Sequence, residues 1–243
     1  MERLTIMGVP FLKIDQQNFV KLMLKRIENK EKTFVVTANP EIVMAANENP
    51  ELMAYIDKST YVTADGIGVV KAAKILGDEL PGRVTGFDTV MALFASQTPM
   101  KVYLLGAQQE TLDQTVANIR RDFPHIDIVG AHNGFFDWEN NTIAEDMLAA
   151  KPDLILVALG VPRQEKWIST QIDKFEHGVF IGVGGTFDAI AGTMKRAPII
   201  WQKLNLEWLY RVAGHPSRWK RALALPKFAL KVFGLKLKGQ GLK

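Results

Sequence analysis

Residues 153–165 read DLILVALGVPRQE, and this stretch decides the fold. Its first seven residues are almost wholly apolar and rich in β-prone side chains, which is typical of a strand buried on both faces. Gly160-Val161-Pro162 ends the strand, and a helix is expected from Gln164 to Lys174. A buried strand that turns directly into a helix is the repeating unit of a parallel, helix-covered sheet.

The same unit recurs along the chain. Besides residues 153–159, strands are expected at 4–9, 33–38, 61–64, 101–106, 126–130 and 179–183. One helix is expected from Asp15 to about Lys30, a second begins at Pro40, and a third follows Asp65-Gly66 and ends at about Leu76. Further helices are expected over 110–123 and 143–150, and residues 77–87 are expected to form a loop. The pattern predicts an α/β fold with a Rossmann-like, mostly parallel sheet over residues 1–194, and a basic helical appendage over residues 195–243.

Composition sets broad limits on the class of protein. The chain has 243 residues, of which 47% are apolar and 23% charged, so collagen-like, low-complexity and wholly disordered classes are excluded. It has no cysteine, which excludes disulfides, thiolate metal sites and cysteine nucleophiles. No signal peptide is visible, and no apolar run approaches the ~20 residues of a membrane-spanning helix. The expected location is therefore the cytoplasm.

Charge is unevenly distributed along the chain. Residues 195–243 contain 12 basic residues and one acidic residue, a net charge of +11. The remaining residues hold 18 basic and 25 acidic side chains, a net charge of −7. This asymmetry indicates a polyanionic partner for the C-terminal part, with nucleic acid, anionic lipid and a diphosphate-bearing substrate as candidates. The alternative is a solvated basic tail.

The basic tail also has a helical pattern. One stripe carries Lys220, Lys227, Lys231 and Lys238, and another carries Leu225, Phe228, Ala229, Val232 and Leu235. Large apolar residues opposite lysines are typical of a helix that lies in a membrane interface. The pattern therefore predicts binding to an anionic membrane surface, and packing of the apolar stripe on the domain is the alternative.

Polar and glycine-rich segments follow the expected strands. In open α/β sheets ligands bind beyond the carboxyl ends of the strands, so these segments are expected at one edge. Gly184-Gly185-Thr186 suits a phosphate cradle before a helix, or is a tight strand–helix turn. Asp65, before Gly66, is a candidate general base or a helix N-cap.

Neither a metal nor a cofactor is expected. No histidine fits a ligand pattern such as H-E-x-x-H, and no Asp-x-Asp occurs. The chain also lacks the G-x-G-x-x-G of a dinucleotide site after its first strand, which argues against a dehydrogenase. Positive charge for a diphosphate would then come from Arg83, Arg163 and Lys195-Arg196, unless these are solvated surface groups.

Taken together, the segments resemble the WecG/TagA/CpsF glycosyltransferase family. The matching segments within the expected sheet domain are Thr37-Ala38-Asn39-Pro40-Glu41, Ala64-Asp65-Gly66-Ile67-Gly68-Val69-Val70, Arg83-Val84-Thr85-Gly86, Gly160-Val161-Pro162-Arg163-Gln164-Glu165 and Gly182-Val183-Gly184-Gly185-Thr186-Phe187-Asp188. Downstream, Arg196-Ala197-Pro198, residues 207–211 (EWLYR) and residues 216–221 (PSRWKR) also match. The resemblance covers nearly the whole chain in order and spacing.

The resemblance implies an inverting, metal-independent transfer in wall teichoic acid linkage-unit synthesis. N-acetylmannosamine would pass from UDP-N-acetylmannosamine to the 4-hydroxyl of GlcNAc on undecaprenyl diphosphate, at the inner face of the cell membrane. By matched position, Asp65 would be the general base, and three side chains would orient sugar and diphosphate: Thr37, Asn39 and Gln164. UDP would lie at Gly184, Gly185 and Asp188, and the diphosphate would be approached by Arg83, Arg211, Arg218 and Arg221. Relatives also suggest self-association into a homo-oligomer.

Two other interpretations stay open. A related transferase would use the uronic acid of UDP-N-acetylmannosamine, or UDP-glucose, as its donor. A nucleic-acid-binding module would use the basic C-terminal segment and bind with a strong dependence on salt. No RNA-recognition, helix-turn-helix or zinc-finger pattern supports the second interpretation.

Overall fold

A computed structural model describes residues 1–194, 198, 201 and 223–238 of the chain. Within that part, eight strands form one sheet in the order β1-β2-β4-β3-β8-β7-β5-β6. The strands are β1 (Arg3–Ile6), β2 (Val9–Leu12), β3 (Thr33–Ala38), β4 (Tyr61–Ala64), β5 (Met100–Gly106), β6 (Ile126–His132), β7 (Leu154–Ala158) and β8 (Val179–Gly182). The β1–β2 pair is antiparallel and the other described pairs are parallel, which confirms the predicted α/β class.

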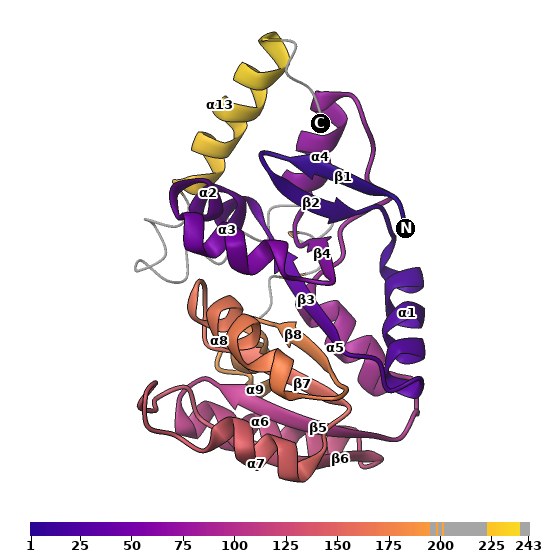
Figure 1. The fold of residues 1–243 in the computed structure, drawn as a ribbon. Coiled ribbons are helices and arrows are strands. Elements are labelled where there is room, and N and C mark those ends of the chain that lie inside the picture. Colours follow the sequence, from indigo (N-terminus) through magenta and orange to yellow (C-terminus); the bar gives the residue numbers. More distant parts are fainter. Residues whose placement is uncertain (195–197, 199–200, 202–222, 239–243) are drawn as a thin grey trace.

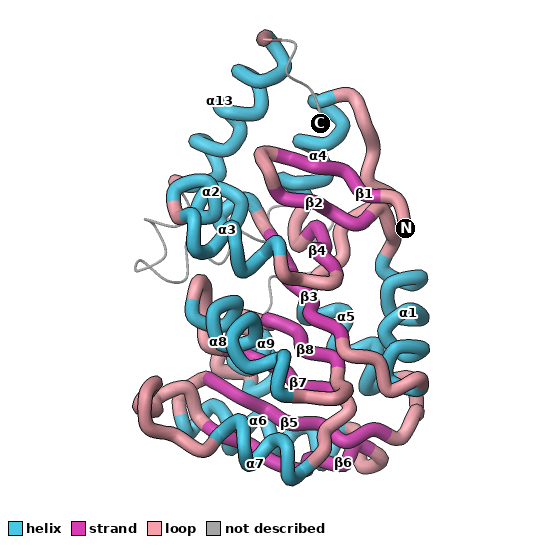
Figure 2. Tube along the Cα trace, in the orientation of Figure 1, coloured by secondary structure: helices cyan, strands magenta, loops and turns pink. Residues whose placement is uncertain are grey.

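Helices cover both faces of this sheet (Figures 1 and 2). One face packs against α2 (Pro40–Glu48), α3 (Pro50–Asp57), α4 (Ile67–Leu76), α7 (Ile143–Ala150) and α8 (Arg163–Gln171), the last followed by a short 3-10 helix, Ile172–Lys174. The other face packs against α1 (Gln16–Glu28), α5 (Gly86–Ala95), α6 (Gln109–Asp122) and α9 (Thr186–Ala191). The final described helix is α13 (Ala224–Leu237).

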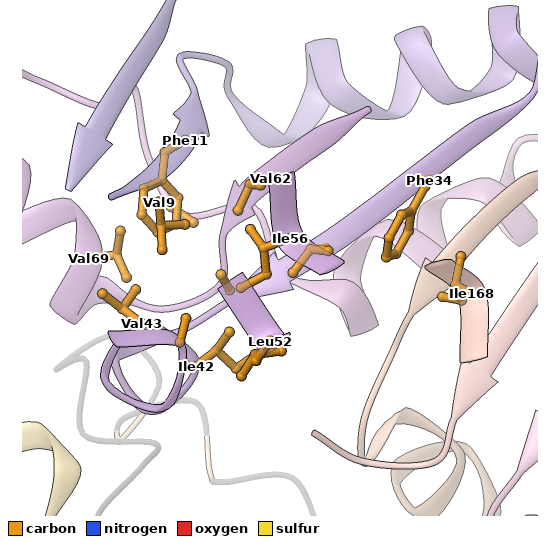
Figure 3. Packing of buried hydrophobic residues seen from close by; sticks show 14 of the residues in the cluster. Val9, Phe11, Phe34, Ile42, Val43, Leu52, Ile56, Val62, Val69 and Ile168 are labelled. Carbon is orange, nitrogen blue, oxygen red and sulfur yellow. The ribbon is translucent and has the colours of Figure 1, made fainter. Parts of the chain in front are cut away.

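The central strands are apolar throughout because both of their faces are covered. In β7, Ile155 and Val157 point into one hydrophobic cluster while Leu156 points into the other. Figure 3 shows part of the first cluster, where Phe11 from β2 and Val43 from α2 lie among the buried side chains. This two-sided burial is why the strand at residues 153–159 has so clear a sequence pattern.

The prediction of one continuous strand over residues 4–9 is wrong. Instead the chain forms a hairpin, in which Met7 and Gly8 make the turn with φ values of 50° and 84°. A two-residue turn with positive φ at both positions matches the twist of paired strands. Glycine suits the second position, but Met7 carries no sign of such a turn, so the apolar run predicts one continuous strand.

The loop expected at residues 77–87 ends earlier than predicted, because α5 begins at Gly86. Thr85 caps this helix: its hydroxyl accepts a hydrogen bond from the Asp88 backbone N–H at 3.0 Å. Thr85 is a preferred N-cap residue, so the sequence did contain the signal for this start.

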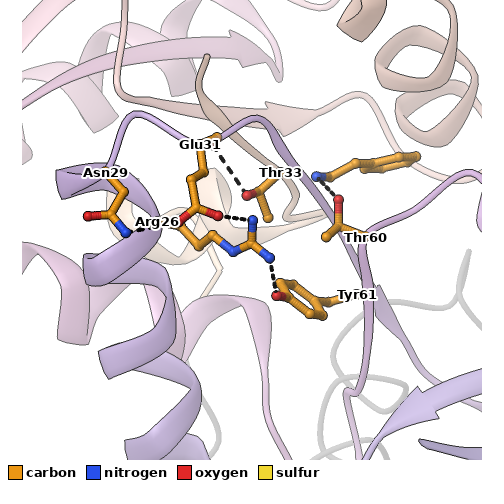
Figure 4. Close-up of polar contacts among 7 residues, drawn as sticks. Arg26, Asn29, Glu31, Thr33, Thr60 and Tyr61 are labelled. Atoms are coloured by element: carbon orange, nitrogen blue, oxygen red, sulfur yellow. Dashed lines mark hydrogen bonds and ion pairs between the residues drawn. The ribbon is translucent and has the colours of Figure 1, made fainter. Parts of the chain in front are cut away.

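At the amino ends of β3 and β4, a polar cluster sets the strand register (Figure 4). The Arg26 guanidinium pairs with Glu31 and donates to the Tyr61 hydroxyl, which joins α1 to the start of β4. The Phe34 backbone N–H donates to the Thr60 hydroxyl at 3.0 Å. As a result Ala38 and Ala64, the last residues of β3 and β4, lie side by side.

Helix α13 packs against α2 and α4, beside which it lies in Figure 1. Its Phe228 and Val232 are 3% and 1% exposed and belong to the core cluster. These two residues of the stripe predicted to face a membrane are therefore buried against the protein, and the alternative, packing on the domain, is confirmed for them. Ala229 of the same stripe is exposed. Membrane binding by this helix stays a prediction.

Candidate active site

Three neighbouring strands end side by side and carry the candidate residues. β3 lies between β4 and β8, and its Val36 is paired with Gly182 of β8. Strands in a sheet are roughly 4.8 Å apart, so segments that follow β4 and β8 are separated by about 10 Å. Asp65 and the Gly184 turn thus flank the end of β3, at one edge, as the spacing of the motifs predicted.

Asp65 follows β4 and does not cap the next helix. The N-cap of α4 is Gly66, with a φ of 132° that suits glycine, and no side chain caps this helix. The half-buried Asp65 carboxylate instead accepts a hydrogen bond from the Gly86 backbone N–H at 3.3 Å, across the strand-end loop. The N-cap interpretation is therefore wrong, and the role of this carboxylate as a general base stays a prediction.

Thr37 and Asn39 both make contacts within the protein. The buried Thr37 hydroxyl donates to the Gly182 carbonyl at 2.8 Å, which ties β3 to β8. The Asn39 side-chain oxygen accepts from the Ile42 backbone N–H at 3.0 Å and so caps α2. A contact of either side chain with sugar or diphosphate stays a prediction.

Gln164 lies behind the Gly184 turn. Its amide oxygen accepts from the Gly184 backbone N–H at 3.2 Å, and its amide nitrogen donates to Glu165 at 2.9 Å. A Cβ at Gly182 would lie 2.7 Å from the same amide nitrogen, so a larger residue there would displace the Gln164 amide. Gln164 is 2% exposed, and in this structure it supports the turn.

The turn at Gly184 and Gly185 leads directly into the short helix α9. Gly184 has a φ of 51°, and the Thr186 hydroxyl donates to the Val183 carbonyl at 2.8 Å. The Asp188 carbonyl accepts from the Met194 backbone N–H at 3.0 Å, which closes the end of the described domain. This geometry fits the tight strand–helix turn, and phosphate binding here stays a prediction.

The candidate arginines are placed unevenly. Arg163 donates to the Gly134 carbonyl at 3.1 Å and lies 5.2 Å from the Trp138 ring centroid, so it is engaged within the protein. Arg83 is half-buried in the loop between α4 and α5. The arginines expected from the tail lie outside the described residues: Arg196, Arg211, Arg218 and Arg221.

Glu165 is a residue of this site whose importance the sequence did not reveal. It is 1% exposed, and its Oε2 atom has no hydrogen-bond partner among the described residues. Burial raises the pKa of its carboxyl to about 7, against the opposing effect of hydrogen bonds from the Gln164 amide and its own backbone. A glutamate in the first turn of an expected helix looks like a solvated charge, so nothing in the pattern signals burial.

Glu165→Gln is expected to change how stability depends on pH. The wild-type carboxyl has its pKa near 7 when folded and near 4.5 when unfolded, so the folded state holds the extra proton between these values. Wild-type stability therefore falls by roughly 2–3 kcal/mol as pH rises from 5 to 8 through this group, and the variant lacks that fall. Urea unfolding of both proteins at pH 5 and pH 8 measures it; equal pH dependence would contradict the assignment.

Metal-binding and membrane-spanning features are absent from the part of the chain that the structure describes. No three His, Cys, Asp or Glu side chains gather there in a way that could hold a metal ion. None of the described helices combines the length and apolarity needed to cross a bilayer.

Comparisons with known proteins match nearly the whole chain. The sequence model described as "Glycosyl transferase WecG/TagA/CpsF family" matches residues 4–241. A protein of Bacillus spizizenii (strain ATCC 23059 / NRRL B-14472 / W23) is 35% identical over 235 residues, covering 96% of this chain and 91% of its own. A protein of Staphylococcus aureus (strain MW2) is 36% identical over 248 residues, covering 98% and 96%. Both relatives are named N-acetylglucosaminyldiphosphoundecaprenol N-acetyl-beta-D-mannosaminyltransferase.

Proposed function

Because the chain belongs to the WecG/TagA/CpsF family of glycosyltransferases, we propose that it adds N-acetylmannosamine to GlcNAc on undecaprenyl diphosphate. The donor in this proposal is UDP-N-acetylmannosamine, the reaction inverts the anomeric centre, and no metal ion takes part. The names of the relatives support the transferred sugar and the lipid-linked acceptor. The product belongs to the linkage unit of wall teichoic acid.

The observation that carries the proposal is the position of Asp65 at the edge formed by β4, β3 and β8. Asp65 follows β4 and the turn proposed to hold the UDP diphosphate follows β8, so their backbone segments are two strand spacings, about 10 Å, apart. In the proposal the donor sugar occupies that interval, with its anomeric carbon toward the diphosphate and the acceptor on the Asp65 side. The Asp65 carboxylate then takes a proton from the incoming hydroxyl.

The proposed reaction is a single displacement. Asp65 takes the proton of the GlcNAc 4-hydroxyl, and that oxygen bonds to the anomeric carbon as the bond to the UDP oxygen breaks. Negative charge then grows on the leaving diphosphate. Backbone N–H groups near Gly185 and arginines from the chain supply the positive potential that stabilises it. The arginines proposed for this are Arg83, Arg211, Arg218 and Arg221.

Purified protein, UDP-N-acetylmannosamine and a lipid-linked GlcNAc analogue test the proposal directly. We expect a disaccharide lipid whose new linkage has the inverted configuration by NMR, and equal rates with and without a chelator. Competition with UDP-glucose and with the uronate donor separates the related activities. A faster rate with either competitor would assign that sugar nucleotide as the donor instead. Absence of transfer from every UDP sugar would reject the proposed function.

We propose that the reaction takes place at the membrane, and that the enzyme binds the membrane through the face of α13 that points away from the rest of the protein. Leu230, Phe233 and Leu237 are 74%, 54% and 88% exposed there, at helical spacings of three and four residues. Lys227 and Lys231 are exposed between this apolar face and the face that packs on the domain. An exposed apolar stripe edged by lysines suits an interfacial helix on an anionic surface. We propose that residues 195–243 form the appendage that brings the enzyme to the inner face of the cell membrane.

Replacing Leu230, Phe233 and Leu237 together with Gln is expected to abolish binding to vesicles that contain anionic lipid. Each buried apolar side chain contributes ~1.5–3 kcal/mol, so the loss of three weakens partition by at least roughly 1,000-fold. Co-sedimentation with vesicles measures this, and Lys174→Gln, a surface lysine away from α13, is the matched control. If the triple variant co-sediments as the wild type does, the exposed face of α13 is not the surface that binds the membrane.

A further inference from the structure

Buried and part-buried polar contacts hold the segment Gly182–Gly184 from behind. Glu165 accepts from the Gln164 amide, Gln164 accepts from the Gly184 N–H, and Thr37 donates to the Gly182 carbonyl. The Gly182 position leaves only enough space for the Gln164 amide. These contacts link α8, β8 and β3 directly beneath the proposed donor site.

We propose that Glu165 is a positioning residue that fixes the orientation of the Gln164 amide and, through it, the Gly182–Gly185 turn. An amide side chain has an oxygen at one end and a nitrogen of nearly equal size at the other, so packing alone does not orient it. If Gln164 were reversed, its oxygen would face the Glu165 carboxyl oxygen and its NH2 would face the Gly184 N–H. The second contact is repulsive, and the first is repulsive when Glu165 is ionised, so the ionised carboxylate and the Gly184 N–H together permit one orientation only.

The environment of Glu165 argues for this role over simple packing. A carboxyl that is 1% exposed, with one oxygen unpartnered among the described residues, destabilises the fold relative to an apolar side chain of the same size. The contact that it makes is to Gln164, and Gln164 makes the contact to Gly184. The buried acid is therefore best explained by the orientation that it imposes on its neighbour.

The consequence for the reaction rests on the proposed function, in which this turn meets the donor diphosphate. With its Gly184 N–H anchored to Gln164, the turn is held in one conformation before the donor arrives. A turn that must be ordered on binding weakens the donor complex and leaves the acceptor complex unchanged. The predicted effect of losing Glu165 is therefore a higher KM for the UDP sugar, with the KM for the lipid-linked acceptor unchanged.

Two substitutions of Glu165 and one control test the role. Glu165→Gln keeps an oxygen that can accept from Gln164, while Glu165→Met keeps the length of the side chain with only a weak sulfur acceptor. Ser169→Ala changes an equally buried residue one turn later on α8. We expect a donor KM raised roughly 10- to 100-fold in Glu165→Met, and a value within about threefold of wild type in the other two. A lower kcat at unchanged donor KM in Glu165→Met, or equal loss in Glu165→Gln, would overturn the role.

Hydrogen exchange keeps this inference separate from the proposed function. We expect the Gly184 amide to exchange at least roughly tenfold faster in Glu165→Met than in wild type, with Glu165→Gln close to wild type. That pattern in a protein without transfer activity would reject the proposed function and keep the positioning role. Equal Gly184 exchange in all variants would reject the positioning role whatever the activity.

Discussion

Asp65→Asn is expected to lower turnover by roughly 10²–10⁴-fold while leaving the chain folded. The asparagine side chain can still accept the hydrogen bond from the Gly86 backbone N–H, so the strand-end loop keeps its contact. What it loses is the ability to take the proton from the acceptor hydroxyl. Turnover at saturating donor and acceptor, with urea unfolding on the same samples, measures both halves of the expectation.

A carboxylate elsewhere on the surface provides the matched control for Asp65. Asp122 pairs with its neighbour Arg121 at the end of α6, and Asp122→Asn removes one negative charge there. This variant should keep wild-type turnover, so a loss seen only in Asp65→Asn reports the site. Wild-type turnover in a folded Asp65→Asn protein would remove the general-base assignment.

Ending the chain after residue 194 is expected to leave a folded domain with turnover reduced by at least roughly 100-fold. The deletion removes the proposed appendage arginines and the exposed face of α13 together. It also uncovers the surfaces of α2 and α4 that bury Phe228 and Val232, so a stability loss of roughly 3–6 kcal/mol should accompany it. Turnover with a water-soluble acceptor, circular dichroism and urea unfolding are the measurements.

Replacing Arg211, Arg218 and Arg221 with Gln in the full chain separates charge from packing. We expect this variant to lose turnover while keeping the stability that α13 confers. If the shortened chain turns over the soluble acceptor at the full rate, the appendage has no part in the chemistry. Its role would then be confined to the membrane.

The sequence predicted most of the sheet because the physical signals there are local. β3, β7 and β8 are short apolar runs that end close to a glycine or proline, and this pattern is typical of strands buried on both faces. Their carboxyl ends must share an edge in a parallel sheet, so the meeting of the Asp65 and Gly184 segments also followed from the pattern. The hairpin at Met7 could not be predicted because a methionine with positive φ leaves no mark in the sequence.

The internal contacts of the site could not be predicted from the sequence. By matched position Gln164 is expected to orient substrate, and its amide also supports the turn from behind. Glu165 belongs to the same matching segment, but nothing in the sequence marks it as buried. Burial decides both roles, and burial depends on how α8 packs on β8. The sequence also predicted that Phe228 and Val232 of α13 face a membrane, whereas they pack against the protein. A helix with two apolar faces carries no sequence signal for which face packs against the rest of the chain.

The β1–β2 hairpin has a practical consequence for anyone shortening this chain. β1, a strand of four residues, is one edge strand of the sheet. The Arg3 guanidinium donates a hydrogen bond to the Thr60 carbonyl at 2.9 Å. Removing the first seven residues would leave β2 as a bare rim carrying the wholly buried Phe11. Unpaired strand groups next to uncovered aromatic surface recruit other chains. We expect such a shortened protein to aggregate during expression, before its activity could be measured. A purification tag should therefore be fused ahead of Met1, with the first seven residues kept.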